Sequence, residues 1–280
     1  TAAGKGTRYL PDYHSLTPDT VWAVLQQYLD IDDPESINLQ MFNSFLDGSK
    51  SAIEMTAVCN ATGLIPQDAG LQFPSASRFE LADICKPSSD GGVLTRSGTT
   101  EVVSSLTRAG ETVAHHLAMG TFVVIQAGSD YARQCLREYH MLPDKTGQYG
   151  ALYRPTHMIG LELGVSIASV ALRGEPTGQP MCFSSDVVAI AKRDLKIGEL
   201  LDGEGGHCVF GRQMPSEKSL SARTVPLGLS AGMRLVRNVA SGQMLCRDDV
   251  DVGTPDEATL ARDEMVSAFA PPKIPPATQQ

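Results

Sequence analysis

Residues 41–63 read MFNSFLDGSKSAIEMTAVCNATG, and this stretch decides the fold. Four polar residues recur in it every three or four positions: Asn43, Asp47, Lys50 and Glu54. At about 100° per residue, one helix would hold them within roughly 60° of one another. The rest of that helix is mostly apolar, whereas an ordinary surface helix has an apolar stripe of limited width. The sequence therefore predicts a buried helix with a narrow line of polar residues, which we call the polar seam.

The polar seam is the first candidate active site, because buried charges are costly unless they pair, bind a metal or meet a polar ligand. Lys50 would supply a positive charge or a proton, and Asp47 and Glu54 would ligate a metal or exchange protons. Asn43 would orient a hydroxyl or carbonyl group. Lysine beside carboxylates in a dry site is a common arrangement for proton transfer. In the alternative, Asp47–Lys50 and Lys50–Glu54 form a ladder of ion pairs without any ligand.

A second cluster of candidate residues lies near the start of the chain, where Lys5 stands between two glycines and is followed by Arg8, Tyr9 and His14. Glycines beside a lysine let the backbone approach an anion closely, and Arg and Tyr add donors suited to a phosphate. The spacing is not that of a P-loop. The cluster predicts a phosphate site, and the alternative is an exposed loop.

A third cluster contains Tyr153 and His157 at the start of an apolar segment that predicts a helix over residues 155–172. His157 would lie at the positive end of this helix, where a neutral imidazole or a bound anion is favoured. Glu162 would be buried in the helix unless paired, and it joins Asp47 and Glu54 as a candidate metal ligand. The alternative is a core histidine with an ion pair between Glu162 and Arg173.

Composition limits the classes of partner. The chain has 280 residues and a formal net charge of -9, which argues against nucleic acid or an anionic membrane as its main partner. The longest apolar run, residues 158–172, is too short to span a membrane. Six cysteines without a CxxC pair predict reduced thiols. We therefore expect a cytoplasmic protein that takes a small anionic molecule through local cations.

Elements outside the seam are predicted from local signals. Residues 101–128 contain two β-rich runs with a hairpin signal at 108–110, and Ser129 should cap a helix that follows. Residues 174–185 resemble an interdomain linker. No GxGxxG turn, HExxH or GxSxG motif is present, so nothing in the chain binds a dinucleotide by the usual strand–turn–helix route.

The last third of the chain contains an internal repeat. AKRDLKIGELLDGE, from Ala191, matches LVRNVASGQMLCRDD, from Leu235, at one constant offset. Gly198 corresponds to Gly242. This predicts a small β domain of duplicated halves with a turn glycine in each. After Thr254 we expect at most one helix and a disordered tail.

Several long segments resemble one known family, the homoserine-dehydrogenase-like oxidoreductases with a C-terminal SAF domain. They are AAGKGTRYLPDYHSLTPDTVW (2–22), MFNSFLDGSKSAIEMTAVCNATGL (41–64), YRPTHMIGLELGVSIASVALRGEPTG (153–178) and DGEGG (202–206). The family includes enzymes similar to 1-deoxy-D-xylulose-5-phosphate reductoisomerase. The resemblance implies an α/β (α+β) catalytic and dimerising domain over residues 1–183, a SAF-like β-clip domain over 184–253, and a short helix and tail over 254–280.

The resemblance also implies an N-terminal Rossmann domain for NADP(H), which would precede residue 1 and is absent from this chain. We therefore expect a homodimeric, NADPH-dependent oxidoreductase of a small phosphorylated keto-sugar, with a divalent metal as a further requirement of the rearrangement step. The 280-residue chain by itself would be inactive. Two alternatives stay open: a simple dehydrogenase of a hydroxy or amino acid, and a SAF-type carbohydrate-binding or assembly module without catalysis.

Overall fold

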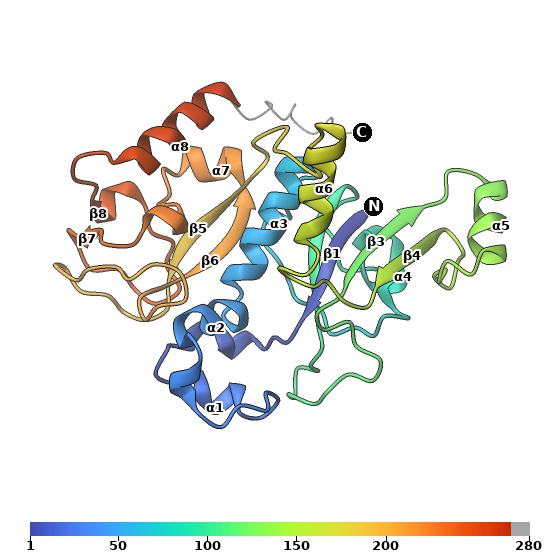
Figure 1. The fold of residues 1–280 in the computed structure, drawn as a ribbon, viewed down its shortest axis with the longest axis horizontal. Coiled ribbons are helices and arrows are strands. Elements are labelled where there is room, and N and C mark those ends of the chain that lie inside the picture. The colour runs from blue at the N-terminus through green and yellow to red at the C-terminus, as the bar shows by residue number, and fades with distance from the viewer. Residues whose placement is uncertain (270–280) are drawn as a thin grey trace.

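The computed structural model describes residues 1–269 and has a mixed α/β fold built on a four-stranded sheet (Figure 1). The strand order is β2-β1-β3-β4, with bounds β1 (Ala2–Thr7), β2 (Thr99–Ser104), β3 (Thr121–Gln126) and β4 (Tyr149–Arg154). β1 and β2 are parallel, whereas β1–β3 and β3–β4 are antiparallel. Small antiparallel sheets follow in the C-terminal part. The predicted fold class, an α/β domain followed by a small β region, is confirmed.

The remaining elements lie beside this sheet or in the C-terminal β region on the other side of α3 (Figure 1). The α-helices of the described residues are α1 (Trp22–Leu25), α2 (Leu39–Leu46), α3 (Ser49–Thr62), α4 (Leu81–Ile84), α5 (Asp130–Glu138), α6 (Leu163–Arg173), α7 (Ser216–Ser221) and α8 (Glu257–Ala268). The C-terminal strands are β5 (Ser185–Ala191), β6 (Val209–Pro215), β7 (Arg234–Leu235) and β8 (Val250–Asp251). Ser129 caps α5 as predicted, through a hydrogen bond from the backbone N–H of Ala132. In the part of the chain that the structure describes, no helix has the length and apolar character needed to cross a membrane.

Helix α3 is the central element of the molecule. It lies between the four-stranded sheet and the β5–β6 pair (Figure 1). Ala52 belongs to the core of the C-terminal β region, whereas Met55 packs with Tyr9 and Phe73 against the other side. This double packing explains why the apolar residues surround the helix, and the predicted burial is confirmed.

The prediction of one continuous helix for the polar seam is wrong. Helix α2 ends before Asp47, and α3 begins after Gly48, whose φ of +90° lies in the left-handed region that favours glycine. Asn43 therefore belongs to α2 and Asp47 to its C-terminal end, while Lys50 and Glu54 belong to α3. Hydrophobic periodicity continues across the break, which is why the sequence pattern did not reveal it.

The internal repeat is confirmed by hydrogen bonds that equivalent residues exchange. Leu195 and Val239, which correspond in the two units, each donate a backbone N–H to the other's carbonyl at 2.8 and 3.0 Å. The two turn glycines behave alike, since Gly198 and Gly242 have φ of +89° and +76°. The halves are thus related by an approximate two-fold axis. The domain boundary at residue 183 and the SAF assignment stay predictions.

Three local predictions need correction or qualification. The turn at 108–110 forms, but β1 lies between β2 and β3, so the two β-rich runs are not neighbours in the sheet. The apolar helix begins at Leu163 and not near residue 155, because Gly160 turns the chain with a φ of +83°. Helix α8 forms after Thr254, whereas the predicted disordered tail falls on residues 270–280, outside the described part. All six cysteines are free thiols, as expected.

Candidate functional site

Lys5 and Glu54 form the ion pair at the centre of the candidate site. Strand β1 directs Lys5 towards α3, where its Nζ lies 2.5 Å from Oε2 of Glu54. Lys5 is only 5% exposed, while the Glu54 side chain is 30% exposed. A nearly buried ammonium with a partly accessible carboxylate is suited to orient and protonate a bound polar group.

The glycines on either side of Lys5 serve packing, and the alternative of an exposed loop is wrong. A Cβ on Gly4 would lie 1.9 Å from the carbonyl oxygen of Glu101, and one on Gly6 would lie 1.9 Å from that of Leu117. Both positions thus let β1 approach its neighbours closely. The same tight placement fixes the direction in which Lys5 points.

A second ion pair lies one helical turn from the first. Lys50, four residues before Glu54 on α3, has its Nζ 3.4 Å from Oε1 of Glu204, and each side chain is 33% exposed. Glu204 comes from the DGEGG loop at 202–206. We call Lys5, Glu54, Lys50 and Glu204 the mixed-charge cluster.

The DGEGG loop reaches the cluster because α2 holds it. The side-chain Nε2 of Gln40 donates to the carbonyl of Glu204 at 2.9 Å, and Nδ2 of Asn43 donates to that of Gly205 at 2.8 Å. Gly205 has a φ of +70°, and a Cβ there would lie 2.1 Å from the carbonyl oxygen of Gln40. Glycine is therefore required at this contact. Asn43 is fully buried and acts as part of this attachment.

Asp47 has a different environment from the other seam charges. Its Oδ2 lies 2.8 Å from Nζ of Lys192, with side-chain exposures of 0% and 1%. Lys192 also donates to the carbonyls of Leu16 and Gly206, each at 2.7 Å. Oδ1 of Asp47 accepts the N–H of Ser49. These contacts enclose the pair and join the helices to the C-terminal β region.

The alternative of an ion-pair ladder along the seam is wrong. Asp47, Lys50 and Glu54 each pair with a residue of another element, namely Lys192, Glu204 and Lys5. The charges of the seam therefore connect α3 and the end of α2 to three other parts of the chain: strand β1, the DGEGG loop and Lys192.

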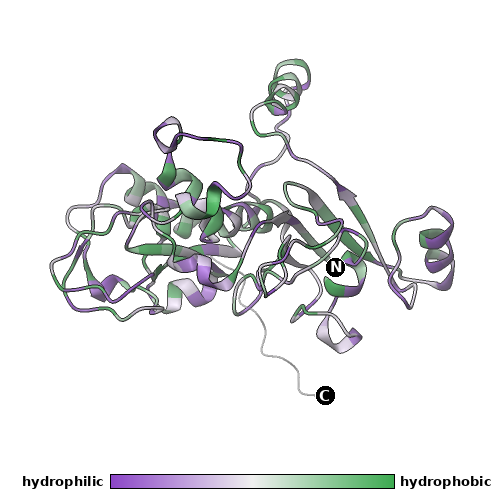
Figure 2. Ribbon diagram, turned by 90° about the horizontal axis from the view of Figure 1, so that it is seen from below, coloured by the Kyte–Doolittle hydropathy of each residue, from purple (hydrophilic) through white to green (hydrophobic). Residues whose placement is uncertain are grey.

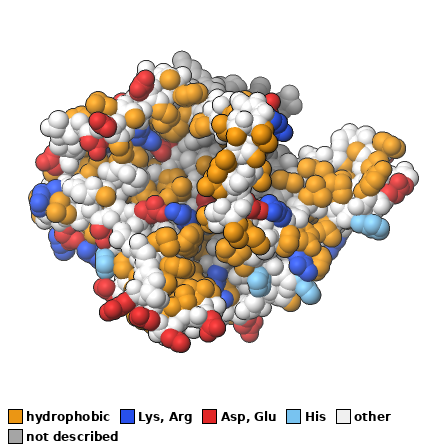
Figure 3. Space-filling model, in the orientation of Figure 1, with side chains coloured by type: hydrophobic (Ala, Val, Ile, Leu, Met, Phe, Trp, Pro, Cys, Tyr) orange, Lys and Arg blue, Asp and Glu red, His pale blue; other side chains and the backbone are white. Residues whose placement is uncertain are grey.

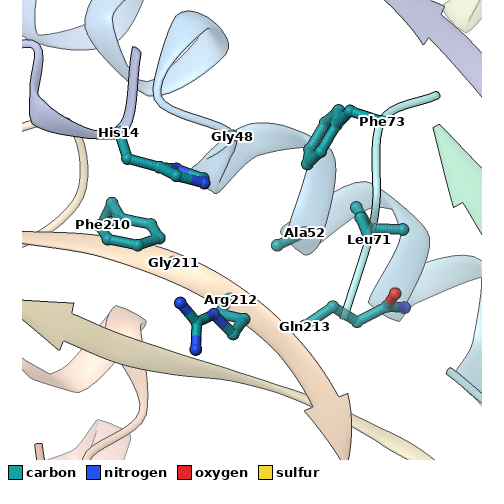
Figure 4. A pocket seen from close by; sticks show the side chains of 9 residues that line it. All are labelled: His14, Gly48, Ala52, Leu71, Phe73, Phe210, Gly211, Arg212 and Gln213. Carbon is teal, nitrogen blue, oxygen red and sulfur yellow. The ribbon is translucent and has the colours of Figure 1, made fainter. Parts of the chain in front are cut away.

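Tyr9 and His14 form a dyad beside the start of α3. The phenol of Tyr9 donates to Nε2 of His14 at 2.5 Å, and Nδ1 of His14 donates to the carbonyl of Asp47 at 2.8 Å. Burial lowers the pKa of His14 and raises that of Tyr9 well above its usual range. At neutral pH the dyad is thus a neutral imidazole with a protonated phenol. The His14 ring stacks on Phe210 at 4.2 Å, as Figure 4 shows.

Arg212 is a cation that sequence reasoning missed. It lies on β6, with its guanidinium carbon 5.9 Å from the centre of the Phe210 ring, and it has no ion-pair partner within residues 1–269. With His14 and Phe210 it lines two cavities: one of about 30 Å³ beside Gly48 (Figure 4), and one of about 310 Å³ that also contacts Lys192. The larger cavity has room for a small anionic group. Only the fold brings β6 to the dyad, so no local pattern could have identified Arg212.

The other predicted substrate-binding residues lie apart from the mixed-charge cluster. Arg8 stacks over the Tyr28 ring at 4.6 Å. Tyr153 pairs in register with Phe122 and through it with Gly4, so it points to the sheet face opposite to Lys5. The structure therefore brings together Tyr9 and His14, and separately Lys5 and Glu54.

His157 and Glu162 also have positions different from those predicted. The backbone N–H and the Nδ1 of His157 both contact the carbonyl of Met119, at 2.8 and 2.7 Å, so His157 precedes α6 and does not lie at its positive end. Glu162 pairs with Arg154 and not with Arg173. The residues that were expected to open the helix therefore lie in the segment between β4 and α6.

The predicted metal ligands do not form a metal site in this arrangement. Asp47, Glu54 and Glu162 lie on separate ion pairs, with Lys192, Lys5 and Arg154 respectively. No group of three potential His, Cys, Asp or Glu ligands occurs within residues 1–269. Each of these carboxylates already has one oxygen paired with a lysine or arginine, so the three together do not fit a divalent metal.

The first part of the chain matches the model of a known protein family. The family model described as "Oxidoreductase DRL, catalytic domain" matches residues 1–163, which is more than half of the chain. The matched segment contains the whole four-stranded sheet, the dyad of Tyr9 and His14, and Lys5, Lys50 and Glu54. No curated protein matches the chain.

Proposed function

Because the chain belongs to the family of the oxidoreductase DRL, we propose that it is the catalytic part of an NADPH-dependent enzyme that reduces the carbonyl group of a small phosphorylated keto-sugar. The observation that carries the proposal is the ion pair of Lys5 and Glu54 within the segment that defines the family. Membership in an oxidoreductase family counts against the alternative of a carbohydrate-binding or assembly module without catalysis.

Lys5 is the proposed proton donor. NADPH, when bound, supplies the hydride to the carbonyl carbon. The C=O π bond then breaks towards oxygen, and that oxygen takes a proton from Nζ of Lys5. Glu54, 2.5 Å from the same Nζ, would orient the ammonium towards the oxygen. The residues that would bind the nucleotide are proposed to lie outside residues 1–269.

Lys50 and Glu204 are proposed to bind the substrate hydroxyl groups. Both side chains are one third exposed. The distance of 3.4 Å between Nζ of Lys50 and Oε1 of Glu204 is long enough for a substrate hydroxyl to replace either side chain as the hydrogen-bond partner of the other. Because Lys50 is one turn from Glu54 on α3, a hydroxyl bound there would lie next to the carbonyl at Lys5.

Arg212 and His14 are proposed to bind the phosphate end. They lie beside Gly48, and Glu54 follows Gly48 by six positions, or roughly 9 Å along the helix axis. This is the scale of a small sugar phosphate. The positive end of α3 adds to the attraction for an anion.

The reaction could include a ketol rearrangement before reduction, as in 1-deoxy-D-xylulose-5-phosphate reductoisomerase. Such a step profits from a divalent metal that holds adjacent oxygens. The pairing of Asp47 and Glu54 with lysines favours simple hydride transfer without rearrangement, and a hydroxy or amino acid precursor is the second candidate substrate for such a reaction. A divalent-metal titration of the full-length enzyme separates the two.

The test uses full-length enzyme and follows NADPH oxidation with 1-deoxy-D-xylulose 5-phosphate and with its dephosphorylated form. Lys5→Met should lower kcat by about 10²–10⁴-fold, because it removes the proton donor. Arg212→Gln should raise KM for the phosphorylated compound only. Lys196→Met, at an exposed site in the β region, is the matched control and should leave both parameters unchanged.

Three outcomes would count against these assignments. Wild-type turnover by Lys5→Met would remove Lys5 from the mechanism. An equal rise in KM for both compounds in Arg212→Gln would remove the phosphate site while leaving the carbonyl chemistry intact. No NADPH oxidation with any keto-sugar phosphate would remove the substrate class.

A further inference from the structure

A cavity of about 250 Å³ lies between helix α8 and the C-terminal β region. Its lining residues come from α7, from α8 and from two segments of the β region that pair with each other. Among them are three arginines, Arg223, Arg247 and Arg262, which we call the arginine cluster. One carboxylate, that of Asp263, also lines the cavity. Positive charge is thus concentrated at one place in a chain whose net charge is -9.

The backbone holds two of these arginines opposite each other. The N–H of Arg247 donates to the carbonyl of Arg223 at 2.8 Å, and the next residues, Thr224 and Cys246, form an antiparallel bridge. Arg223 has a φ of +52°, a left-handed conformation that side chains other than glycine rarely adopt. Like charges opposite each other across paired strands are destabilising. An anion between the two guanidinium groups would remove this repulsion.

Arg262 is the fixed member of the arginine cluster. Its Nη1 and Nη2 donate to the two carboxylate oxygens of Asp186 at 3.3 and 2.5 Å, and its side chain is only 16% exposed. Ser219, which also lines the cavity, donates its hydroxyl to the same carboxylate at 2.6 Å. The guanidinium carbon of Arg262 lies 5.5 Å from the centre of the Phe183 ring. These contacts fix the guanidinium before a ligand arrives, which reduces the ordering cost of binding.

The other two arginines keep donors for a ligand. Arg223 pairs with Asp248 at 3.1 Å and Arg247 with Asp263 at 3.6 Å, and all four side chains are between 37% and 64% exposed. Exposed ion pairs contribute little to stability. A guanidinium has five N–H donors, so one contact with a carboxylate leaves most of them available. Figure 3 shows charged side chains of both signs over the region where Figure 1 places α8.

Helix α8 is held on the β region without an apolar core of its own. None of its residues is buried. Two of its contacts with the β region are the ion pairs of Arg262 with Asp186 and of Asp263 with Arg247. An anion bound by the arginine cluster would connect α8 to the paired segments of the β region. A ligand site therefore explains why a helix without buried residues lies here.

We propose that the arginine cluster binds the phosphate group of a small molecule. Three arginines and one aspartate give the lining a charge of +2, and a phosphate monoester has a charge of about -1.5 to -2 at neutral pH. Guanidinium groups match phosphate oxygens with two parallel hydrogen bonds. A cavity of about 250 Å³ is smaller than typical sites for drug-sized ligands, so it suits a phosphate with a small organic part.

The position of the cavity suits a small ligand that arrives from solvent. In Figure 2, hydrophilic segments lie on the outside of the C-terminal β region, at the end of the molecule opposite to α5. The cavity shares no lining residue with the two cavities beside His14 and Arg212. The inference therefore does not rest on the proposed function, and failure of either one leaves the other untouched.

Isothermal titration calorimetry with inorganic phosphate tests the site in the full-length Arg212→Gln variant, which lacks the cation of the separate cavities beside His14. We expect one phosphate to bind per chain. Arg223→Gln and Arg247→Gln, each added to this variant, should weaken binding roughly 10–100-fold, because each removes a charged donor. Arg193→Gln is the matched control and should leave binding unchanged, since Arg193 is a half-exposed, paired arginine of the same region that does not line the cavity. Malonate, a dicarboxylate, should bind at least roughly 10-fold more weakly than phosphate.

The absence of phosphate binding would overturn the proposal, and so would binding that is equal in all three added variants. Equal affinity for malonate would assign the cavity to anions in general and would overturn the phosphate class. A measurement on the wild-type protein keeps the test decisive if a variant fails to fold. Phosphate should protect Arg223 and Arg247, but not Arg193, from modification by phenylglyoxal, as measured by mass spectrometry. Equal modification of Arg223 and Arg247 with and without phosphate would equally overturn the proposal.

Discussion

Replacing Lys192 by Met should strongly destabilise the fold. Lys192 is fully buried with its Nζ 2.8 Å from Asp47, and the same Nζ donates to the carbonyls of Leu16 and Gly206 at 2.7 Å each. The Met side chain has similar length but no donor. It leaves a buried carboxylate without a cation and two carbonyls without a partner.

The expected loss is about 3–5 kcal/mol, the usual effect of removing one partner from a buried ion pair. This is a large fraction of the roughly 5–15 kcal/mol that stabilises a typical domain. With a urea m value of about 3 kcal/mol/M, the urea midpoint of unfolding should fall by roughly 1–1.7 M. Urea titration followed by circular dichroism measures the shift.

Lys218→Met is the matched control, because it makes the same chemical change at an exposed pair. Lys218 lies 3.3 Å from Asp68, and both side chains are about half exposed at 52% and 51%. Its loss should be below about 1 kcal/mol. The double variant Asp47→Leu, Lys192→Met should recover part of the stability, since removing both charges avoids the unpaired carboxylate. If Lys192→Met shifts the midpoint no more than Lys218→Met, the buried pair does not join the two parts of the fold as argued.

Two further predictions concern stability. Burial raises the pKa of Glu101 from 4.5 to about 7, although four donors point at its carboxylate. Between pH 4.5 and 7 the folded state keeps a proton on Glu101 that the unfolded state releases, so the free energy of unfolding should fall by roughly 3 kcal/mol over this range and stay constant below and above it. In urea titrations at several pH values, Glu101→Gln should lose this pH dependence. An unchanged pH dependence would exclude Glu101 as its source. Gly205→Ala should lower the free energy of unfolding by about 1–3 kcal/mol more than Gly253→Ala. Both glycines have a positive φ, but only at position 205 would the new Cβ meet the carbonyl oxygen of Gln40. Equal losses in the two variants would refute the close contact.

Local sequence signals predicted those features that depend on local interactions. A side chain acting on the neighbouring backbone explains the helix cap at Ser129, and local backbone conformation explains the two turn glycines of the repeat. The period of the apolar residues explains the burial of the helix over residues 49–62. The break at Gly48 was missed because the apolar period continues through it. The start of α6 was missed because the backbone of His157 pairs with a loop nearly forty residues earlier.

The sequence by itself determined the class of fold, the family and the residue types of the candidate site, because these depend on composition, on the period of the apolar residues and on long motifs. Only the tertiary structure decided which charges meet. Lys5 was expected to contact a phosphate and Glu54 to ligate a metal or exchange protons, yet the two pair with each other across β1 and α3. Lys192 and Arg212 join the site from the C-terminal β region. Ion pairs between residues far apart in the chain depend on strand order and helix packing, which no local pattern of residues specifies.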